Sequence, residues 1–127
     1  MIEAVLDASA VLADLLNEPG GEAARIAAPR AAISAVNFAE VITKLIDRGM
    51  PAKDARVLAE TAAYQVVVAD QAQATLVGLM HEKTRRTGVS LGDRFCLALA
   101  HETGLPAVTA DRRWKTLDLG IEIDLIR

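Results

Sequence analysis

Four acidic residues stand where short apolar runs end or where helical patterns begin. They are Asp7, Glu40, Asp93 and Asp111. Carboxylate oxygens are hard ligands that suit Mg²⁺ or Mn²⁺, and such ions also bind phosphate oxygens. A bound ion of this kind can lower the pKa of a water molecule and clamp a phosphate group. If the fold brings the four carboxylates together, they are candidate ligands for metal-assisted hydrolysis at a phosphate.

The elements that must position these acids follow from the alternation of short apolar runs with longer helical patterns. Strands are expected at 2–6, 31–34, 66–69 and 107–110, and 121–126 is a candidate for a fifth. Helices are expected at 9–17, 22–28, 36–48, 52–64, 71–87 and 93–103. Strands that alternate with helices indicate a parallel sheet with helices on both faces. We therefore expect one α/β domain over residues 1–127, with a central parallel sheet of four or five strands.

The predicted sheet places all four acids near one edge. Asp7 follows the first strand and Asp111 follows the fourth, so both lie at the carboxyl ends of parallel strands. Glu40 lies in the early turns of the helix after the second strand, and Asp93 opens the helix that leads into the fourth. In sheets of this kind the functional site lies beyond the carboxyl ends of the strands. We expect the four carboxylates to converge on one cleft and, without a cation, at least one of them to hold a proton.

Each acid also has a purely structural explanation. Asp7 and Asp93 could cap the helices that follow them, because aspartate is a preferred N-cap residue. Asp111 could be a turn residue, and Glu40 could be a solvated residue on a helix. The two residues on either side of Glu40 are apolar, which makes simple solvation less favourable there. The case for a site therefore depends on all four acids sharing one edge.

Composition and length limit the class of protein. More than half of the 127 residues are apolar, but the aromatic ones are only two Phe, one Tyr and one Trp, so alanine and aliphatic side chains must build the core. Cys96 is the only cysteine, which excludes an internal disulfide and suits a buried thiol. No apolar stretch is long enough to span a bilayer, and no signal-peptide pattern is present, so a cytoplasmic protein is expected. The net charge of −3 weighs mildly against a nucleic-acid binder, although a metal-filled acidic cleft can accept a polyanion.

Four segments resemble, in order, the successive signatures of PIN domains. They are residues 5–10 (VLDASA), 38–41 (FAEV), 91–100 (LGDRFCLALA) and 108–114 (VTADRRW). The last two are similar to those of VapC toxins, and the order, spacing and length fit over the whole chain. The resemblance implies a three-layer α/β/α fold and an endoribonuclease that depends on Mg²⁺ or Mn²⁺. It also implies a homodimer and a VapB-type antitoxin that holds the toxin inactive.

The resemblance assigns the acidic site to the same four positions. Asp7 and Asp93 would bind the metal directly or through water, and Asp111 would complete the shell. Glu40 would be a further ligand or would orient the attacking water. The supporting polar residues would be Ser9 and Thr109. The proposed reaction is hydrolysis of an RNA phosphodiester by metal-activated water, and the sequence does not identify which acid is the general base.

Basic and aromatic residues next to the acids are candidates to contact RNA. Arg94 follows the third acid, and Arg112, Arg113 and Trp114 follow the fourth. Trp114 could stack on an unpaired base, as aromatic side chains often do with single-stranded RNA. It could equally pack a helix onto the sheet. The segment 18–21 carries no motif, so it informs neither activity nor target.

Two other α/β classes place acids at strand ends. A haloacid-dehalogenase-like phosphatase would need a second aspartate at the position of Ser9, and a receiver domain would need paired acids after the first strand besides Asp70 after the third. Within the PIN family, a housekeeping RNA-processing nuclease and an inactive scaffold are the alternatives. The apolar helix at 10–16 either faces a partner or belongs to the core. The RNA target is not apparent from the sequence.

Overall fold

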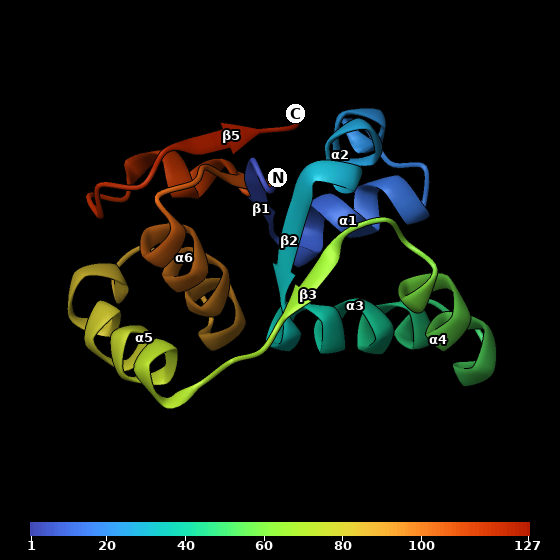
Figure 1. Cartoon of the computed structure of the whole chain (residues 1–127), viewed down its shortest axis with the longest axis horizontal. Coiled ribbons are helices and arrows are strands. Elements are labelled where there is room, and N and C mark those ends of the chain that lie inside the picture. Colours follow the sequence, from blue (N-terminus) through green and yellow to red (C-terminus); the bar gives the residue numbers. More distant parts are fainter.

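The computed structural model describes all of residues 1–127 and contains five short strands in one sheet (Figure 1). The strands are β1 (Ala4–Leu6), β2 (Ala31–Ser34), β3 (Gln65–Val67), β4 (Ala107–Thr109) and β5 (Ile123–Leu125). Their order across the sheet is β3-β2-β1-β4-β5, and every neighbouring pair is parallel. The predicted parallel sheet is confirmed, and the candidate fifth strand is part of it.

Helices connect the strands close to their expected positions. The α-helices are α1 (Ala8–Leu15), α2 (Gly21–Ala27), α3 (Ala35–Asp47), α4 (Ala52–Glu60), α5 (Gln71–Thr84) and α6 (Leu91–Thr103), and two 3-10 helices are η1 (Ala28–Arg30) and η2 (Arg112–Thr116). The helix α4 is shorter than predicted because the chain turns inward after it, where the Tyr64 hydroxyl donates a hydrogen bond of 2.8 Å to the carbonyl of Ala59. No helix combines the length and apolar character needed to cross a lipid bilayer.

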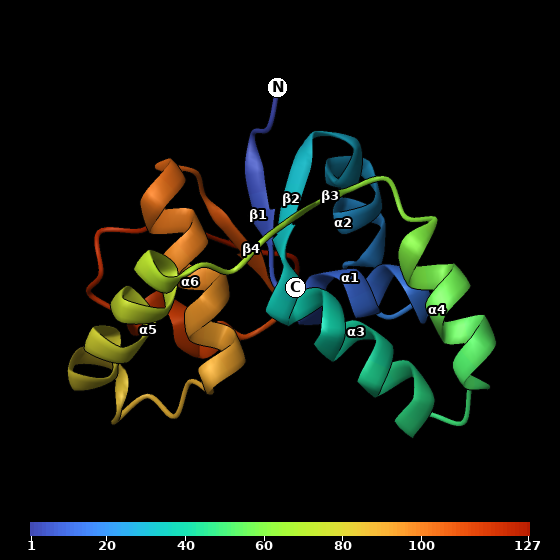
Figure 2. The same cartoon turned by 60° about the horizontal axis from the view of Figure 1, so that its bottom comes forward.

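Alternate residues of each strand face opposite sides of the sheet, which divides the core into two layers. Leu6, Ile33 and Val108 pack against α1 to α4. Val5, Ala32 and Ala107 pack against α5 and α6. Figure 2 shows the sheet between these two groups of helices. The fold is therefore the expected three-layer α/β/α arrangement.

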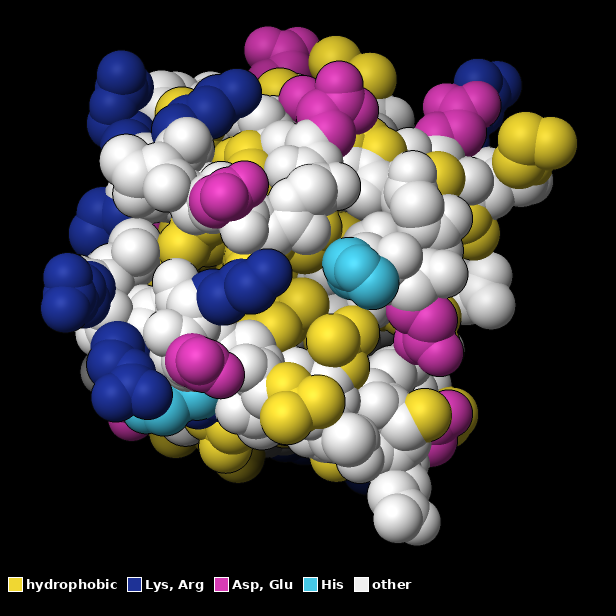
Figure 3. Space-filling model, turned by 90° about the vertical axis from the view of Figure 1, so that its left-hand side faces the viewer, with side chains coloured by type: hydrophobic (Ala, Val, Ile, Leu, Met, Phe, Trp, Pro, Cys, Tyr) yellow, Lys and Arg dark blue, Asp and Glu magenta, His cyan; other side chains and the backbone are white.

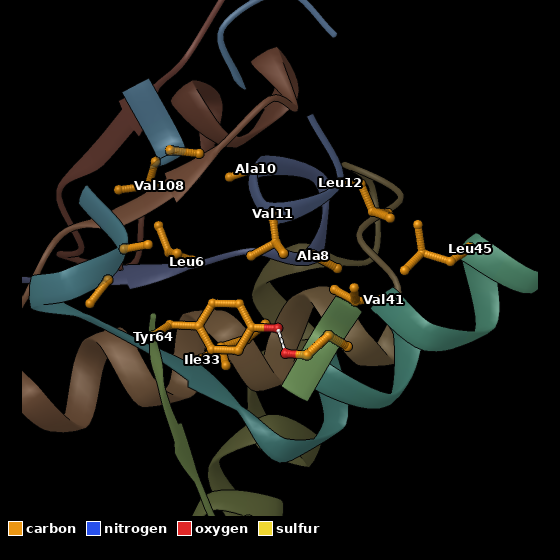
Figure 4. Packing of buried hydrophobic residues seen from close by; sticks show 14 of the residues in the cluster. Leu6, Ala8, Ala10, Val11, Leu12, Ile33, Val41, Leu45, Tyr64 and Val108 are labelled. Atoms are coloured by element: carbon orange, nitrogen blue, oxygen red, sulfur yellow. Dashed lines mark hydrogen bonds between the residues drawn. The ribbon is translucent and has the colours of Figure 1, made fainter. Parts of the chain in front are cut away.

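The layer on the side of α1 to α4 is built from small and aliphatic side chains, as the composition predicted (Figure 4). Val11 of α1 and Val41 of α3 belong to this layer together with Leu6 and Ile33 of the strands, and the Tyr64 ring lies beside Ile33. The stretch from Ala10 to Ala13 is buried here. Most of the apolar helix at 10–16 therefore belongs to the core and cannot face a partner.

The opposite layer carries the lone thiol and an uncovered apolar face. Cys96 is fully buried, as predicted, and burial raises the pKa of its thiol. On the outer face of α5, Leu79 is 69 % exposed beside a shallow hollow. That hollow is lined by Leu76, Leu79, Met80, Lys83, His101 and Leu119. Figure 3 shows hydrophobic side chains gathered in the middle of this face of the molecule.

The chain reverses its direction across the sheet beside β1, and this determines where a site can form. From β1 the chain moves outward to β2 and then β3, and α5 and α6 return it over the other face to β4, on the opposite side of β1. Ligand sites of open α/β sheets lie at such switch points, outside the carboxyl ends of the strands. Asp7 follows β1 and Asp111 lies just beyond β4, so the topology brings these two acids to the switch point.

Candidate active site

A polar cleft of about 360 Å³ opens at the switch point, and all four predicted acids line it. Asp7 comes from the end of β1, Glu40 from α3, Asp93 from the first turn of α6, and Asp111 from the turn after β4. The structure therefore places on one cleft the four carboxylates that the strand ends and helix starts predicted.

Asp7 occupies the N-cap position of α1 but does not cap the helix. Its side chain makes no hydrogen bond to the first turn. Its Oδ2 atom instead accepts hydrogen bonds from the hydroxyls of Ser9, at 2.7 Å, and Thr109, at 2.9 Å. The residue is only 3 % exposed, and no Lys or Arg forms a salt bridge with it. Helix capping therefore does not explain why this carboxylate is buried.

Ser9 and Thr109, the predicted supporting residues, connect the ends of β1 and β4. The Ser9 hydroxyl donates to Asp7 and accepts a hydrogen bond of 3.0 Å from the backbone N–H of Ala110. The Thr109 hydroxyl accepts a bond of 3.0 Å from the backbone N–H of Asp111. The two hydroxyl oxygens are 3.2 Å apart. This network fixes the carboxylate of Asp7 relative to the turn that carries Asp111.

Burial raises the pKa of Asp7 from its ordinary 3.8 to about 6. The negative charges of Asp93 and Glu40 also raise this pKa, while the hydrogen bonds from Ser9 and Thr109 oppose the rise by stabilising the ionised form. One of the clustered carboxylates was expected to hold a proton in the absence of a cation. The structure identifies Asp7 as the carboxylate with the strongest tendency to do so.

Glu40 is positioned by the contact between α3 and α6. The Nδ2 atom of Asn37 donates to Glu40 Oε1, at 2.7 Å, and to the carbonyl of Gly92, at 2.9 Å. A Cβ atom at position 92 would overlap the Glu40 carboxylate, so glycine is needed for this close approach. Asn37 is fully buried and lies one turn before Glu40. Glu40 is therefore held in place at the cleft and is not a freely solvated residue of α3.

Asp93 lies at the third position of α6, because the helix begins at Leu91 rather than near Asp93 as predicted. Ser90 is the N-cap, and its hydroxyl accepts a hydrogen bond of 3.1 Å from the Asp93 backbone N–H. Asp93 Oδ2 accepts one of 2.8 Å from the Ser90 N–H, which completes a capping box. The alternative that Asp93 serves to cap a helix is thus correct for its Oδ2 atom. Its Oδ1 atom accepts no hydrogen bond from the chain and is available to a ligand.

Asp111 is engaged by Arg113, two residues further along. The Nη2 atom of Arg113 donates to Oδ2 at 2.6 Å, and its Nε and backbone N–H each donate to Oδ1 at 3.0 Å. The hydrogen bond from the Arg113 side chain is the main reason why the pKa of Asp111 lies below its ordinary value. Both carboxylate oxygens are occupied, so Asp111 can join a metal shell only after Arg113 moves.

The carboxylates of the cleft are of the right type to bind a hard divalent cation, but they do not form a complete coordination shell. No group of three or more His, Cys, Asp or Glu side chains lies close enough together to hold a metal ion. Mg²⁺ usually takes only one or two protein carboxylates and completes its shell with water and phosphate oxygens, so it does not require such a group. Asp7 is the best candidate ligand, because it is a buried carboxylate that no cation of the chain neutralises.

Of the residues predicted to contact RNA, only Arg113 lines the cleft. Trp114 is fully buried in the layer of α5 and α6, so the prediction that it stacks on a base is wrong. The Nη1 atom of Arg94 donates to the carbonyl of Val77 on α5, at 2.8 Å, which directs its side chain away from the cleft. Arg112 is exposed but does not line the cleft. Neither arginine lines the cleft in this structure, and a contact of either one with RNA stays a prediction.

The cleft contains residues that the motifs did not single out. They include Glu18, Lys44, Arg48 and Arg127. Lys44 and Arg48 follow Glu40 at intervals of four residues, so helical periodicity could have found them. Glu18 belongs to the segment 18–21 that was expected to be uninformative, and that expectation is corrected. Nothing in its local sequence places it at the cleft.

Comparison with known proteins supports the assignment of the fold. The DNA-bound VapBC structure from Salmonella typhimurium has a TM-score of 0.77 and 21 % identity, with 100 % of each chain covered. Mycobacterium tuberculosis VapC20, a sarcin–ricin loop cleaving toxin, has a TM-score of 0.72 and 14 % identity, with 94 % of this chain and 99 % of that chain covered. FitAcB from Neisseria gonorrhoeae has a TM-score of 0.72 and 17 % identity, with 97 % of each chain covered.

Identities this low establish only a shared fold. Membership of a family is established by a match to a family model. No curated protein matches the sequence significantly. A model described as the PIN domain matches residues 4–119, which include all four acids of the cleft. The match spans nearly the whole chain, and this protein therefore belongs to the PIN domain family.

Proposed function

We propose that this protein is a divalent-metal-dependent endoribonuclease and the toxin of a VapBC-type toxin–antitoxin pair. The observation that carries the nuclease proposal is Asp7, a buried carboxylate without a cationic partner, whose pKa is also raised by Asp93 and Glu40. Such a group suits a divalent cation at a phosphate-cleaving site. The similar fold of VapC20, described as a sarcin–ricin loop cleaving toxin, supports RNA as the substrate class.

The residues of the cleft divide the work of the proposed reaction. A bound Mg²⁺ or Mn²⁺ would supply activated water and neutralise charge on the scissile phosphate. Asp7 and Asp93 would hold this ion directly or through water, and Asp111 would complete the shell once Arg113 moves away from it. Glu40, fixed by its hydrogen bond from Asn37, would bind the ion or orient the attacking water. Ser9 and Thr109 would keep the Asp7 carboxylate in position.

Cleavage of total cellular RNA by the purified protein tests the nuclease proposal. Reactions with EDTA, Mg²⁺ and Mn²⁺ are compared for the wild type, Asp7→Asn and Asp93→Asn, each shown to be folded. Asp47→Asn, on an exposed position of α3 outside the cleft, is the charge-matched control. We expect metal-dependent cutting that is lost in the first two variants and kept in the control. No cutting with any metal, or equal cutting by all variants, would contradict the proposal.

Titration calorimetry with Mn²⁺ separates an active nuclease from an inactive scaffold of the same fold. The proposal requires Mn²⁺ binding that is weakened in Asp7→Asn and Asp93→Asn. A scaffold without a metal site would show no binding that depends on these residues.

A VapB-type antitoxin and a second copy of the chain are the proposed protein partners. Several proteins with this fold are described as VapBC complexes, including one from Rickettsia felis bound to a promoter DNA fragment. The surface also provides an apolar groove of about 280 Å³, whose lining includes Leu15, Ala24, Leu58 and Tyr64. Co-expression with the product of a neighbouring reading frame should yield a stable complex with suppressed cleavage. A free monomer that is not toxic would contradict the toxin assignment.

Two alternative functions are a housekeeping PIN nuclease and a phosphoryl-transfer domain, and the structure argues only against the second. A housekeeping PIN nuclease would use the same cleft, so growth arrest on expression distinguishes the toxin from it. A receiver domain is disfavoured, because the strand order β3-β2-β1-β4-β5 differs from the 2-1-3-4-5 order of that class. A haloacid-dehalogenase-like phosphatase is disfavoured because Ser9 stands where its second aspartate would be. Asp70, the aspartate after β3, is exposed and caps α5 through a hydrogen bond of 2.9 Å from the Gln73 N–H.

A further inference from the structure

One face of α3 carries a row of charged residues along the cleft. Glu40, Lys44 and Arg48 all line it. Residues four apart lie on the same face of a helix and are about 6 Å apart along its axis. The row begins with an acid of the candidate active site and ends with two cations. Lys44 forms no salt bridge with any carboxylate of the chain, so its ammonium group is available to a ligand.

Glu18 gathers two arginines from distant parts of the chain at the end of this row. Arg48 Nη2 lies 3.4 Å from Glu18 Oε2, and Arg127 Nη1 lies 3.5 Å from Glu18 Oε1. Arg127 also donates a hydrogen bond of 2.8 Å to the carbonyl of Pro19. The Glu18 side chain is 27 % exposed and that of Arg48 is 63 % exposed, so the acid lies deeper than the cation that it holds. One carboxylate shared by two guanidinium groups leaves a surplus of positive charge facing solvent.

The cleft is therefore divided into two parts of opposite charge. The active-site part holds four acids, Asp7, Glu40, Asp93 and Asp111, against one cation, Arg113. Counted by side chains, the other part holds three cations, Lys44, Arg48 and Arg127, against one acid, Glu18. The whole chain has a net charge of −3, so this positive part is a local exception.

We propose that Lys44, Arg48 and Arg127 form a phosphate-binding lip for single-stranded RNA. With the scissile phosphate at the acids, the phosphates on one side of it lie along the lip. This inference rests on the proposed ribonuclease function and adds a direction to the path of the strand across the cleft. Contacts to phosphate position the nucleic acid and are independent of base sequence. The lip therefore contributes affinity and register, and it leaves the choice of bases to other parts of the surface.

RNA binding by the double variant Lys44→Ala/Arg48→Ala tests the lip. The control is Lys53→Ala/Arg56→Ala, which removes the same charge from exposed positions of α4 outside the cleft. Because partly exposed salt bridges contribute at most about 1 kcal/mol, loss of the contact between Arg48 and Glu18 leaves the fold intact. Fluorescence anisotropy measures the affinity for a labelled single-stranded oligoribonucleotide in EDTA at several salt concentrations.

We expect the lip variant to bind RNAs of different sequence more weakly by a similar factor. The slope of log affinity against log salt concentration should become shallower by about 1.4, since each lost contact to a single strand contributes about 0.7. The control variant should match the wild type. Where cleavage is measured, KM should rise while kcat changes little.

Equal affinity and slope in the lip and control variants, or no binding by the wild type, would overturn the lip. The binding assay contains no free divalent metal and measures no cleavage. A wild-type protein that binds RNA through the lip but never cuts it would count against the proposed function alone.

Discussion

The Asp7 side chain binds its proton more tightly in the folded protein than in the unfolded chain. Burial is the main cause, and it raises the pKa from 3.8 to about 6. Between these two values the folded state holds a proton that the unfolded state releases. The free energy of unfolding of the metal-free protein therefore falls as pH rises from about 4 to about 6, and this loss persists above pH 6. The shift corresponds to a penalty on the order of 3 kcal/mol at neutral pH.

Asp7→Asn should remove this penalty, because an amide has no charge to desolvate and its oxygen can still accept hydrogen bonds from Ser9 and Thr109. In EDTA at pH 8 we expect the variant to be more stable than the wild type, by up to about 3 kcal/mol. At pH 4 the two proteins should be similar. Urea unfolding at both pH values measures the difference. A variant that is less stable at pH 8 would show that the ionised carboxylate is well tolerated in the metal-free protein.

Arg113 competes with a metal ion for Asp111 if that residue is a ligand. Its side chain occupies both carboxylate oxygens in this structure. Arg113→Ala should therefore tighten Mn²⁺ binding several-fold, whereas Asp111→Asn should weaken it. Calorimetry on the two variants measures both effects. Unchanged Mn²⁺ affinity in both would remove Asp111 from the proposed metal shell and leave it with the role of positioning Arg113.

At the level of elements, the candidate site depends on how closely α3 and α6 approach each other. Asn37 of α3 donates to the backbone of α6 at Gly92 and to Glu40 at the same time. The oxygen of its amide is buried and has no hydrogen-bond donor. This asymmetry indicates that the Asn37 side chain is orientated by its two acceptors. The position of Glu40 is therefore a property of the helix pair and not of α3 alone.

Gly92→Ala should move the Glu40 carboxylate without unfolding the protein. The added Cβ meets the flexible end of the Glu40 side chain, which can shift, and alanine is compatible with the first turn of a helix. We expect weaker Mn²⁺ binding and slower cleavage with little change in Tm. The control is Gly78→Ala in α5, where a Cβ meets nothing within 4 Å. It should stabilise the protein by about 0.5–1 kcal/mol and leave activity unchanged; a similar loss of activity in both variants would contradict this explanation.

The order and type of elements could be predicted because each strand is a short apolar run bounded by helical patterns. The positions of Asp7 and Asp111 followed from those runs, since parallel strands share one carboxyl edge. The start of α6 was placed too late, although the serine and aspartate at positions 90 and 93 have the spacing of a capping box. The contact of Glu18 with Arg127 could not be predicted, because it joins residues 109 positions apart through side chains alone. The sequence allowed two roles for Trp114, stacking on an RNA base or packing against the sheet, and the structure shows that it is buried.

For the molecule as a whole, stability depends on two core layers that share one small sheet. Trp114 is the largest fully buried side chain and anchors the layer of α5 and α6. The other layer is made mostly of small side chains, and it contains the edge-on packing of Phe38 against Tyr64, with 6.4 Å between the ring centroids. Because neighbouring residues of each strand face different layers, loss of packing on one side weakens the sheet that supports the other.

Trp114→Ala should lower the free energy of unfolding by about 3–5 kcal/mol, as removal of a large buried aromatic side chain usually does. Trp114→Phe should cost much less, since it also removes an indole N–H that has no acceptor. Urea unfolding of the two variants measures these costs. As the only tryptophan, Trp114 should also keep its emission unchanged when RNA is added to the wild-type protein. Quenching of the native emission by RNA would contradict its burial.

The position of Arg127 has a practical consequence for fusion proteins. This residue lies on the rim of the cleft, whereas Met1 precedes β1 at the amino edge of the sheet, away from the cleft (Figure 2). A purification tag or reporter joined after Arg127 would begin at the mouth of the cleft and would obstruct the approach of a long polynucleotide. The same tag joined before Met1 would leave from the opposite edge. Sequence added after Arg127 should therefore slow the cleavage of long RNAs more than the same sequence added before Met1.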